Sequence, residues 1–182
     1  IIVVARPSDH DVIRETAQQC GITKFHAIVA GGSTRQESVM CGLRALSKGT
    51  TMIAVHDGAR PLVKPEHIAQ VIRDASVFGG ATLGVPVKDT IKVVNDHLIV
   101  DTPYRPHLFI TQTPQVFKRQ LYFEAVTFAE EHALDFTDDC QLIEAINCKV
   151  YMTEGDYTNI KITTPEDIAI AEILLARQKE EA

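Results

Sequence analysis

Short apolar runs alternate with longer amphipathic stretches along this chain. The short runs are rich in β-branched residues and predict strands at Ile1–Ala5, Phe25–Ala30, Thr51–Val55, Ala81–Val87 and Lys149–Thr153. The amphipathic stretches predict helices from Ser8 or Asp9 to Cys20, Thr34 to Ser47, Pro65 to Val77, Arg119 to His132, Asp138 to Ile146, and from Thr164 onward. Repeated strand–helix units are typical of an α/β fold with a mostly parallel, twisted sheet and helices on both faces.

Polar residues mark where several helices begin. Ser33, with Gln36 three positions later, has the spacing of a capping box. Thr137 is a candidate cap for the helix that follows it. Thr164 precedes Pro165 and two acids, which is the order expected at a helix start.

One region, residues 88–106, breaks the strand–helix rhythm. Two short alternating pieces, Thr90–Val94 and His97–Val100, are joined at Asn95-Asp96 and predict a β-hairpin that projects from the body. The hairpin is too small to hold a core of its own. It is either an exposed flap or an arm that packs on a second subunit, and we favour the arm.

The composition is that of one ordinary globular domain, so residues 1–182 are taken as a single unit. Lys and Arg number 18 and Asp and Glu 24, for a net charge of −6; no basic cluster stands out, so nucleic acid is not an expected partner. The four cysteines are scattered, which argues against a disulfide scaffold or a zinc site and favours a reducing cytoplasm. The apolar opening is too short to span a bilayer, so no membrane association is expected. Residue 1 is not methionine and already lies in a predicted strand, so we expect the natural protein to begin earlier.

The segment Val55–Pro61 carries the most informative chemistry. It places Asp57 and Arg60 at the carboxyl end of an apolar strand, where ligands bind in open α/β sheets. A carboxylate accepts hydroxyl hydrogens and a guanidinium binds phosphate oxygens, so the pair suits a substrate with both groups. A structural ion pair that steadies a loop is an equally good explanation from this segment alone.

Four other polar segments lie next to predicted strands. Gly31-Gly32-Ser33 allows close approach of the backbone to a ligand at a helix start, although a plain tight turn is the favoured explanation. Residues 88–92 form either a ligand-facing loop or a solvated hairpin stem. Thr111–Gln115 is predicted as a polar loop that binds a ligand or caps the next helix. Lys161 interrupts a strand-like alternation over Asn159–Thr163, where its ammonium either reaches solvent or meets an anion.

Six motifs occur in a fixed order along the chain: Gly-Gly-x-x-Arg-x-x-Ser-Val, His-Asp-Gly-Ala-Arg-Pro, Val-Pro-Val-x-Asp-Thr-Ile-Lys, Gln-Thr-Pro-Gln-x-Phe, Thr-Asp-Asp and Asn-Ile-Lys-Ile-Thr-Thr-Pro-Glu-Asp. Each is weak alone, but the set closely resembles the 2-C-methyl-D-erythritol 4-phosphate cytidylyltransferase family over essentially the whole chain. The resemblance implies a Rossmann-like nucleotidyltransferase fold and a homodimer formed through an arm at residues 88–107. It also implies Mg²⁺-dependent transfer of CMP from CTP to a polyol phosphate, with release of pyrophosphate, in non-mevalonate isoprenoid biosynthesis.

The resemblance implies roles for individual residues. The implied nucleotide-binding residues are Gly32, Ser33, Ser38, Asp57, Gly58 and Lys161, of which the first three lie near cytosine and ribose and Lys161 near the triphosphate. The residues implied to face the polyol phosphate are Asp57, Arg60, Thr90, Arg105 and Thr113. Arg105 and Lys161 are the implied catalytic residues, and Arg105 reaches the partner subunit's site. Asp57 is the implied metal ligand, although Mg²⁺ takes most of its ligands from substrate phosphates.

The sequence departs from the family pattern in two ways. The family's loop Leu-Ala-Ala-Gly-x-Gly-x-Arg-Met and the Pro-Lys that follows it, which surround the triphosphate, are absent from this sequence. Ser33 and Thr158 stand where family members often carry an acid. Two other functions therefore stay open at this point. One is a ribitol-5-phosphate cytidylyltransferase, and the other is a non-catalytic nucleotide-binding or dimerisation module.

Overall fold

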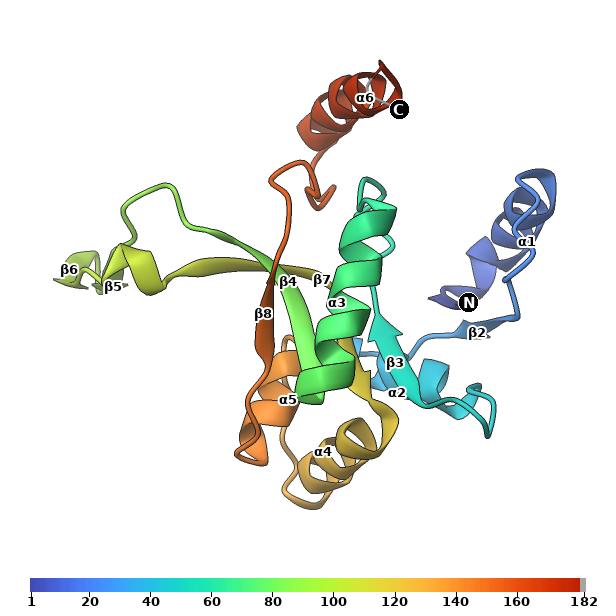
Figure 1. Ribbon diagram of the computed structural model, residues 1–182, viewed down its shortest axis with the longest axis horizontal. Helices are drawn as coiled ribbons and strands as arrows, with labels where there is room; N and C mark the ends of the chain where they lie inside the picture. The colour runs from blue at the N-terminus through green and yellow to red at the C-terminus, as the bar shows by residue number, and fades with distance from the viewer. Residues whose placement is uncertain (181–182) are drawn as a thin grey trace.

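A computed structural model describes residues 1–180, and Figure 1 shows the arrangement of its elements. The strands are β1 (Ile2–Ala5), β2 (Ala27–Ala30), β3 (Met52–Val55), β4 (Gly80–Pro86), β5 (Val93–Asn95), β6 (Leu98–Asp101), β7 (Phe109–Lys118) and β8 (Tyr151–Glu154). The α-helices are α1 (His10–Gln19), α2 (Arg35–Arg44), α3 (Pro65–Phe78), α4 (Arg119–Glu131), α5 (Asp139–Ala145) and α6 (Pro165–Glu180), with single turns η1 (Pro7–Asp9) and η2 (Arg105–His107). The predicted α/β class and the projecting hairpin are confirmed. The prediction of one domain extends to residue 182, and residues 181–182 lie outside the described part.

The central sheet has the strand order β3-β7-β4-β8. β4 and β8 are parallel, as are β1 and β2 in a separate pair, whereas β7 is antiparallel to both of its neighbours. The prediction of a loop at Thr111–Gln115 is wrong, because these residues lie inside β7. The polar run hid the strand from sequence reasoning, but Gln112, Thr113 and Gln115 are all buried there.

Helices cover both faces of this sheet. Neighbouring side chains of β7 point in opposite directions, so each face of the strand packs against a different set of helices. Val116 packs with Val71 and Ala75 of α3 on one face. Phe117 packs on the other face, in a larger cluster to which α2, α4 and α5 contribute. Gly80 lies opposite Phe117 across the β4–β7 pairing, and a Cβ there would approach the Phe117 ring to 2.8 Å. The expected two-sided burial of the sheet is therefore confirmed.

Two helix caps differ from the predictions by one residue. Thr34, not Ser33, caps α2 and forms a full capping box with Glu37. Asp138, not Thr137, caps α5 by accepting from the N–H groups of Cys140 and Gln141. Ser33 and Thr137 each stand next to the true cap, and several side chains of the right type at adjacent positions make the sequence ambiguous.

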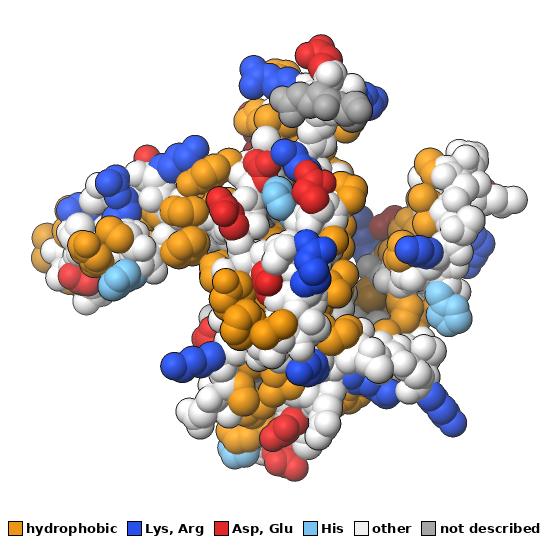
Figure 2. Space-filling model, in the orientation of Figure 1, with side chains coloured by type: hydrophobic (Ala, Val, Ile, Leu, Met, Phe, Trp, Pro, Cys, Tyr) orange, Lys and Arg blue, Asp and Glu red, His pale blue; other side chains and the backbone are white. Residues whose placement is uncertain are grey.

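The hairpin β5–β6 projects from the body as an arm, which is seen on the left of Figure 1. Its turn is at Asp96-His97, one position beyond the predicted Asn95-Asp96, and both residues have positive φ (45° and 64°). Figure 2 shows hydrophobic side chains grouped on this arm, where Leu98, Ile99 and Val100 are 59–70% exposed. In the described part of the chain, no helix has both the length and the apolar character required to cross a bilayer.

Candidate functional site

The loop after β3 brings Asp57 and Arg60 together. The N–H of Arg60 donates to the backbone carbonyl of Asp57 (2.9 Å), which closes a tight turn through Gly58. The turn places Arg60 Nε 3.5 Å from Asp57 Oδ2, and both side chains are largely buried. The space beside the Gly58 Cα is open, so ligand atoms can approach the backbone there.

Lys161 reaches the same carboxylate from the other end of the sequence. Its Nζ lies 3.0 Å from Asp57 Oδ2, and the N–H of Ile162 donates to the carbonyl of Ala59 (2.8 Å). The prediction of a strand-like alternation at Asn159–Thr163 is wrong, since this segment has no regular structure. The expectation that Lys161 meets an anion is met within the protein, because its partner is Asp57. Thr158 carries no charge, so it does not compete for the lysine.

Thr113, on β7, completes a group with Asp57, Arg60 and Lys161 that we call the Asp57 cluster. Its Oγ1 accepts the backbone N–H of Asp57 (3.0 Å) and lies 2.9 Å from His56 Nδ1. His56 Nε2 lies 3.1 Å from the carbonyl of Arg60, which can only accept, so the neutral ring carries its hydrogen on Nε2. The Thr113 hydroxyl hydrogen is then directed to Nδ1. Burial lowers the pKa of His56, against opposing effects of the Arg60 carbonyl and the Asp57 charge, so the neutral form is favoured.

The cluster has a surplus of positive charge. Burial raises the pKa of Asp57, but the hydrogen bond from Lys161 and the charges of Lys161, Arg60 and Arg35 outweigh burial and hold it below its usual value. Two cations, Arg60 and Lys161, therefore share one ionised carboxylate. Both approach Oδ2, and Oδ1 has no hydrogen bond or ion pair within residues 1–180. Arg60 Nε is also buried without a hydrogen-bond acceptor in the same residues. The site thus offers Asp57 Oδ1 and the half-exposed ammonium of Lys161 to a ligand.

The loop before α2 forms a second part of the candidate site. The N–H of Gly32 donates to Ser38 Oγ (3.1 Å), and the N–H of Ser33 donates to Glu37 Oε2 (2.6 Å). A Cβ at Gly32 would overlap the Glu37 side chain, so only glycine fits. Hydrogen bonds from Ser33 and Thr34 lower the pKa of Glu37, which supplies an acid beside Ser33.

A hollow of about 390 Å³ opens beside this loop. It is lined by β1, η1, Arg6 between them, Gly31 and Gly32 of the loop, and Ser38 of α2. Its volume is within the range of small-ligand sites. The structure therefore places two of the predicted nucleotide residues, Gly32 and Ser38, at the wall of a cavity.

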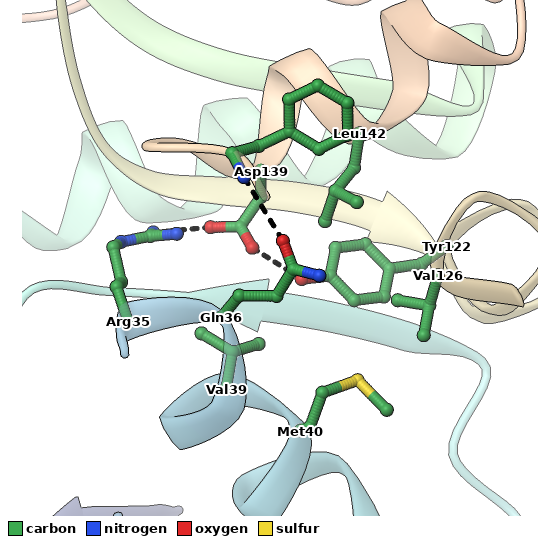
Figure 3. Close-up of a pocket in the computed structure, with 9 residues that line it drawn as sticks. Arg35, Gln36, Val39, Met40, Tyr122, Val126, Asp139 and Leu142 are labelled. Atoms are coloured by element: carbon green, nitrogen blue, oxygen red, sulfur yellow. Dashed lines mark hydrogen bonds and ion pairs between the residues drawn. The ribbon is translucent and has the colours of Figure 1, made fainter. Parts of the chain in front are cut away.

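Arg35, the first residue of α2, is held by a buried carboxylate. Figure 3 shows Arg35 and Tyr122 directed at Asp139, which is 1% exposed. Arg35 Nη2 lies 2.5 Å from Asp139 Oδ2, the Tyr122 hydroxyl donates to Oδ1, and the N–H of Asp139 donates to Gln115 (2.9 Å). The pocket drawn in Figure 3 has a volume of only about 10 Å³, which is at most the room for one water molecule, so this network is structural.

Thr90 and Arg105 lie away from the Asp57 cluster, on the arm. Both are exposed, and Arg105 Nη1 donates to the carbonyl of Lys88 (3.0 Å) at the root of the hairpin. No hydrogen bond or ion pair within residues 1–180 joins either residue to Asp57, Arg60 or Lys161. One chain therefore does not bring together all of the predicted substrate residues.

Few side chains near the Asp57 cluster can act as metal ligands. Across the described residues, no three His, Cys, Asp or Glu side chains are grouped as metal ligands. Asp57, with its free Oδ1, is the carboxylate that can bind a cation here. A single carboxylate fits Mg²⁺, which binds through one or two carboxylates and substrate phosphates.

Sequence reasoning missed several residues that shape the site: His56, Gln112, Glu37, Asp139 and Asn159. The Thr34-x-x-Glu37 spacing could have identified Glu37 as half of a capping box. His56 and Asn159 flank residues that were singled out, but nothing in a sequence shows which way their side chains point. Asp139 occurs in the Thr-Asp-Asp motif, but sequence reasoning assigned it no role of its own.

Comparison with known proteins gives a consistent result. The family model for 2-C-methyl-D-erythritol 4-phosphate cytidylyltransferase (IspD) matches residues 1–177. Proteins of that name from Caldanaerobacter subterraneus subsp. tengcongensis and Desulforamulus reducens are 45% and 43% identical, over 97% and 98% of this chain and 79% and 77% of their own. The crystal structure of 4-diphosphocytidyl-2C-methyl-D-erythritol synthase from Anaerococcus prevotii has a TM-score of 0.88 at 32% identity, covering 97% of this chain and 78% of that chain.

Proposed function

This chain belongs to the 2-C-methyl-D-erythritol 4-phosphate cytidylyltransferase family of nucleotidyltransferases, and from that premise we propose how its site works. The reaction joins CTP and 2-C-methyl-D-erythritol 4-phosphate. An oxygen of the 4-phosphate attacks the α-phosphorus of CTP, the bond to the β-phosphate breaks, and pyrophosphate leaves. The product is 4-diphosphocytidyl-2-C-methyl-D-erythritol.

The chemistry of the nucleophile agrees with the residues present. A phosphate monoester has a second pKa of about 6 and is largely dianionic at neutral pH, so no side chain has to be activated for attack. The site instead has to bring two anions into line and neutralise the charge that grows on the transferred and leaving groups. The observation that carries the proposal is that Arg60 and Lys161 converge on one carboxylate, which leaves a net positive charge.

We assign the hydroxyl groups of the polyol substrate to Asp57 and its phosphate to Arg60. Asp57 Oδ1 is free to accept a hydroxyl hydrogen, and the guanidinium of Arg60 beside it suits phosphate oxygens. Thr113, assigned to the same substrate, holds the backbone of Asp57 from β7. Lys161 is assigned to the triphosphate, and Gly32, Ser33, Ser38 and Gly58 to the nucleotide, where the hollow beside α2 supports a place for the base and ribose.

Mg²⁺ is proposed as the cofactor. Asp57 would hold it together with phosphate oxygens and water, since a carboxylate oxygen has two lone pairs and Oδ1 can bind the ion and accept the polyol hydroxyl hydrogen. The ion would supply positive charge to the triphosphate when bound. Arg60 and Lys161 orient the two phosphates whether or not the ion is present.

A homodimer formed through the arm at residues 88–107 completes the proposal. Its support is the exposed apolar surface of β5–β6 and the position of Arg105 away from the Asp57 cluster of its own chain. Thr90 and Arg105 would then face the polyol phosphate of the partner subunit. The cytoplasm is proposed as the location, and four cysteines that are free thiols support it.

The test is a pyrophosphate-release assay with CTP and Mg²⁺ and either of two polyol phosphates. We expect release with 2-C-methyl-D-erythritol 4-phosphate and at least 10-fold slower release with ribitol 5-phosphate. A preference for ribitol 5-phosphate would assign the chain to the other polyol. Cytidine nucleotide binding without release from either substrate would indicate a non-catalytic module.

A further inference from the structure

The segment at residues 155–164, which we call the Lys161 segment, connects β8 to α6 without regular secondary structure. A few backbone hydrogen bonds hold it, among them that from Ile162 to Ala59 (2.8 Å), and buried side-chain contacts set the rest of its course. Lys161 has a long, flexible side chain that is 47% exposed, so its own packing holds it weakly. The 3.0 Å contact with Asp57 depends on where the backbone of this segment lies.

Asn159 fixes that backbone from inside the protein. It is 1% exposed, and its Nδ2 donates to the carbonyl of Thr113 (3.0 Å) and to Gln112 Oε1 (3.4 Å). Its own carbonyl accepts from Arg60 Nη1 (2.8 Å). One residue thus ties the Lys161 segment to β7 and to the loop that carries Arg60.

Gln112 makes the reciprocal contacts from β7. It is 4% exposed, and its Nε2 donates to the carbonyls of Asp156 (2.8 Å) and Asn159 (3.4 Å). Gly155 leaves room for it, since a Cβ there would overlap Gln112 Oε1. The two buried amides therefore form a reciprocal clamp between β7 and the Lys161 segment.

The chemistry of this clamp requires an amide at position 159. Nδ2 faces two oxygen acceptors, and Oδ1 is buried without a partner in the described part of the chain. A carboxylate of the same shape would place negative charge against those acceptors and bury it unpaired. Asn159→Asp is therefore a change of almost no volume that should break the clamp.

We propose that Asn159, supported by Gln112, is a positioning residue that holds Lys161 at the reacting phosphates. It touches no substrate and acts through the place it gives the ammonium two residues later. This inference rests on the proposed role of Lys161. Displacement of a catalytic group by about 1 Å costs on the order of 100-fold in rate, so the clamp has a large effect on turnover.

The test reads the position of Lys161 separately from activity. Lysines are labelled by reductive methylation with 13C-formaldehyde, and the Lys161 resonance is assigned by its loss in Lys161→Ala. Asp57→Asn gives the reference for an unpaired Lys161. We expect Asn159→Asp to move the resonance toward that reference. Asn147→Asp, the same change at an exposed site, should leave it in place.

Steady-state kinetics provide a second test. Asn159→Asp should lower kcat by 10- to 100-fold with less than 3-fold change in KM for either substrate. In the Lys161→Ala background, Asn159→Asp should lower kcat by less than a further 3-fold, because Asn159 acts through that lysine. Gln112→Glu, which keeps the acceptor for Asn159 and loses the donor, should give a smaller change of the same kind.

The outcomes distinguish failure of the positioning role of Asn159 from failure of the proposed function. A folded Asn159→Asp protein that keeps the wild-type Lys161 resonance overturns the inference. So does an Asn159→Asp change that lowers kcat by the same factor in the presence and absence of Lys161. Failure of both Asn159→Asp and Gln112→Glu to fold also overturns it, because the amides would then be needed for stability alone. If the wild-type chain transfers no cytidylyl group, the proposed function fails, while the resonance still decides whether Asn159 places Lys161.

Discussion

The ammonium of Lys161 lies 3.0 Å from Asp57 Oδ2, although 104 positions separate the two residues in the chain. The contact joins the loop after β3 to the irregular segment after β8. It defines the place where a carboxylate for hydroxyl groups and a cation for phosphates meet. The proposed reaction depends on this meeting point more than on any other single contact.

Lys161→Ala should lower kcat by about 100- to 1,000-fold, the usual effect of removing one preorganised charge-stabilising group. The KM for the polyol phosphate should change little, since Lys161 is assigned to the triphosphate. Steady-state kinetics with each substrate varied will measure both constants. Lys149→Ala, at an exposed lysine, is the control. A Lys161→Ala enzyme with normal kcat and a raised polyol phosphate KM would reverse the assignment.

Arg60→Ala should raise the KM for methylerythritol phosphate, because it removes the donors that face its phosphate. Arg60→Lys should recover only part of the loss, since lysine lacks the planar fork of the guanidinium. The measurement is the dependence of initial rate on polyol phosphate concentration at saturating CTP. Equal KM values for all three proteins would remove Arg60 from the polyol site.

Arg105→Ala and Lys161→Ala should complement each other when mixed, if the arm acts on the partner subunit. Each mutant alone would be impaired at both of its sites. A mixed dimer would contain one site with Arg105 and Lys161 both intact, so up to about a quarter of wild-type activity should return after random exchange of subunits. Proven exchange of subunits, for example by mass spectrometry, with no recovery of activity would show that Arg105 acts within its own chain.

The stability of the fold at low pH should depend on Asp156. Burial raises the pKa of Asp156, but hydrogen bonds from Lys64 and from the N–H of Thr158 outweigh burial and bring it to about 2. Because this pKa is below that of the unfolded chain (3.8), the stabilisation is complete above pH 4 and is lost as the pH falls from 4 toward 2. Urea unfolding between pH 5 and pH 2.5 should show a shallower loss of stability in Asp156→Asn. The same slope in both proteins would contradict the role of this pair.

Asp139→Ala should reduce the free energy of unfolding by about 3 kcal/mol, because it leaves Arg35 and the buried Tyr122 hydroxyl without their partner. The lower end of the range for a buried pair applies, since Arg35 is 34% exposed. Urea denaturation will measure the loss. Asp135→Ala, in the exposed loop before α5, should stay within about 0.5 kcal/mol of wild type, and an equal loss there would contradict the account.

The sequence predicted most elements of this fold because their signals are local. Pro65 and Arg119 mark helix starts as predicted, and the apolar runs of β3 and β4 stand out from their neighbours. β7 was missed altogether, because a buried strand with Gln112, Thr113 and Gln115 in its middle has no hydrophobic pattern. It is stable because those side chains find partners on distant segments. Its antiparallel direction is likewise a property of the assembled sheet.

The candidate site was predictable to the extent that its residues occur in motifs. Asp57, Arg60, Thr113 and Lys161 were singled out, and the structure places them in one cluster. The contacts of His56, Asn159 and Asp139 could not be foreseen, because each joins segments more than 15 positions apart, and a single sequence does not show which distant side chains meet. The roles of Thr90 and Arg105 depend on a second chain.

The most direct test of the central claim is a crystal structure with a non-hydrolysable CTP analogue, Mg²⁺ and methylerythritol phosphate. The account predicts a polyol hydroxyl on Asp57 Oδ1, the polyol phosphate on Arg60, and the triphosphate beside Lys161. Well-ordered ligands bound together at a different place, with the Asp57–Lys161 contact unchanged and facing only solvent, would contradict it.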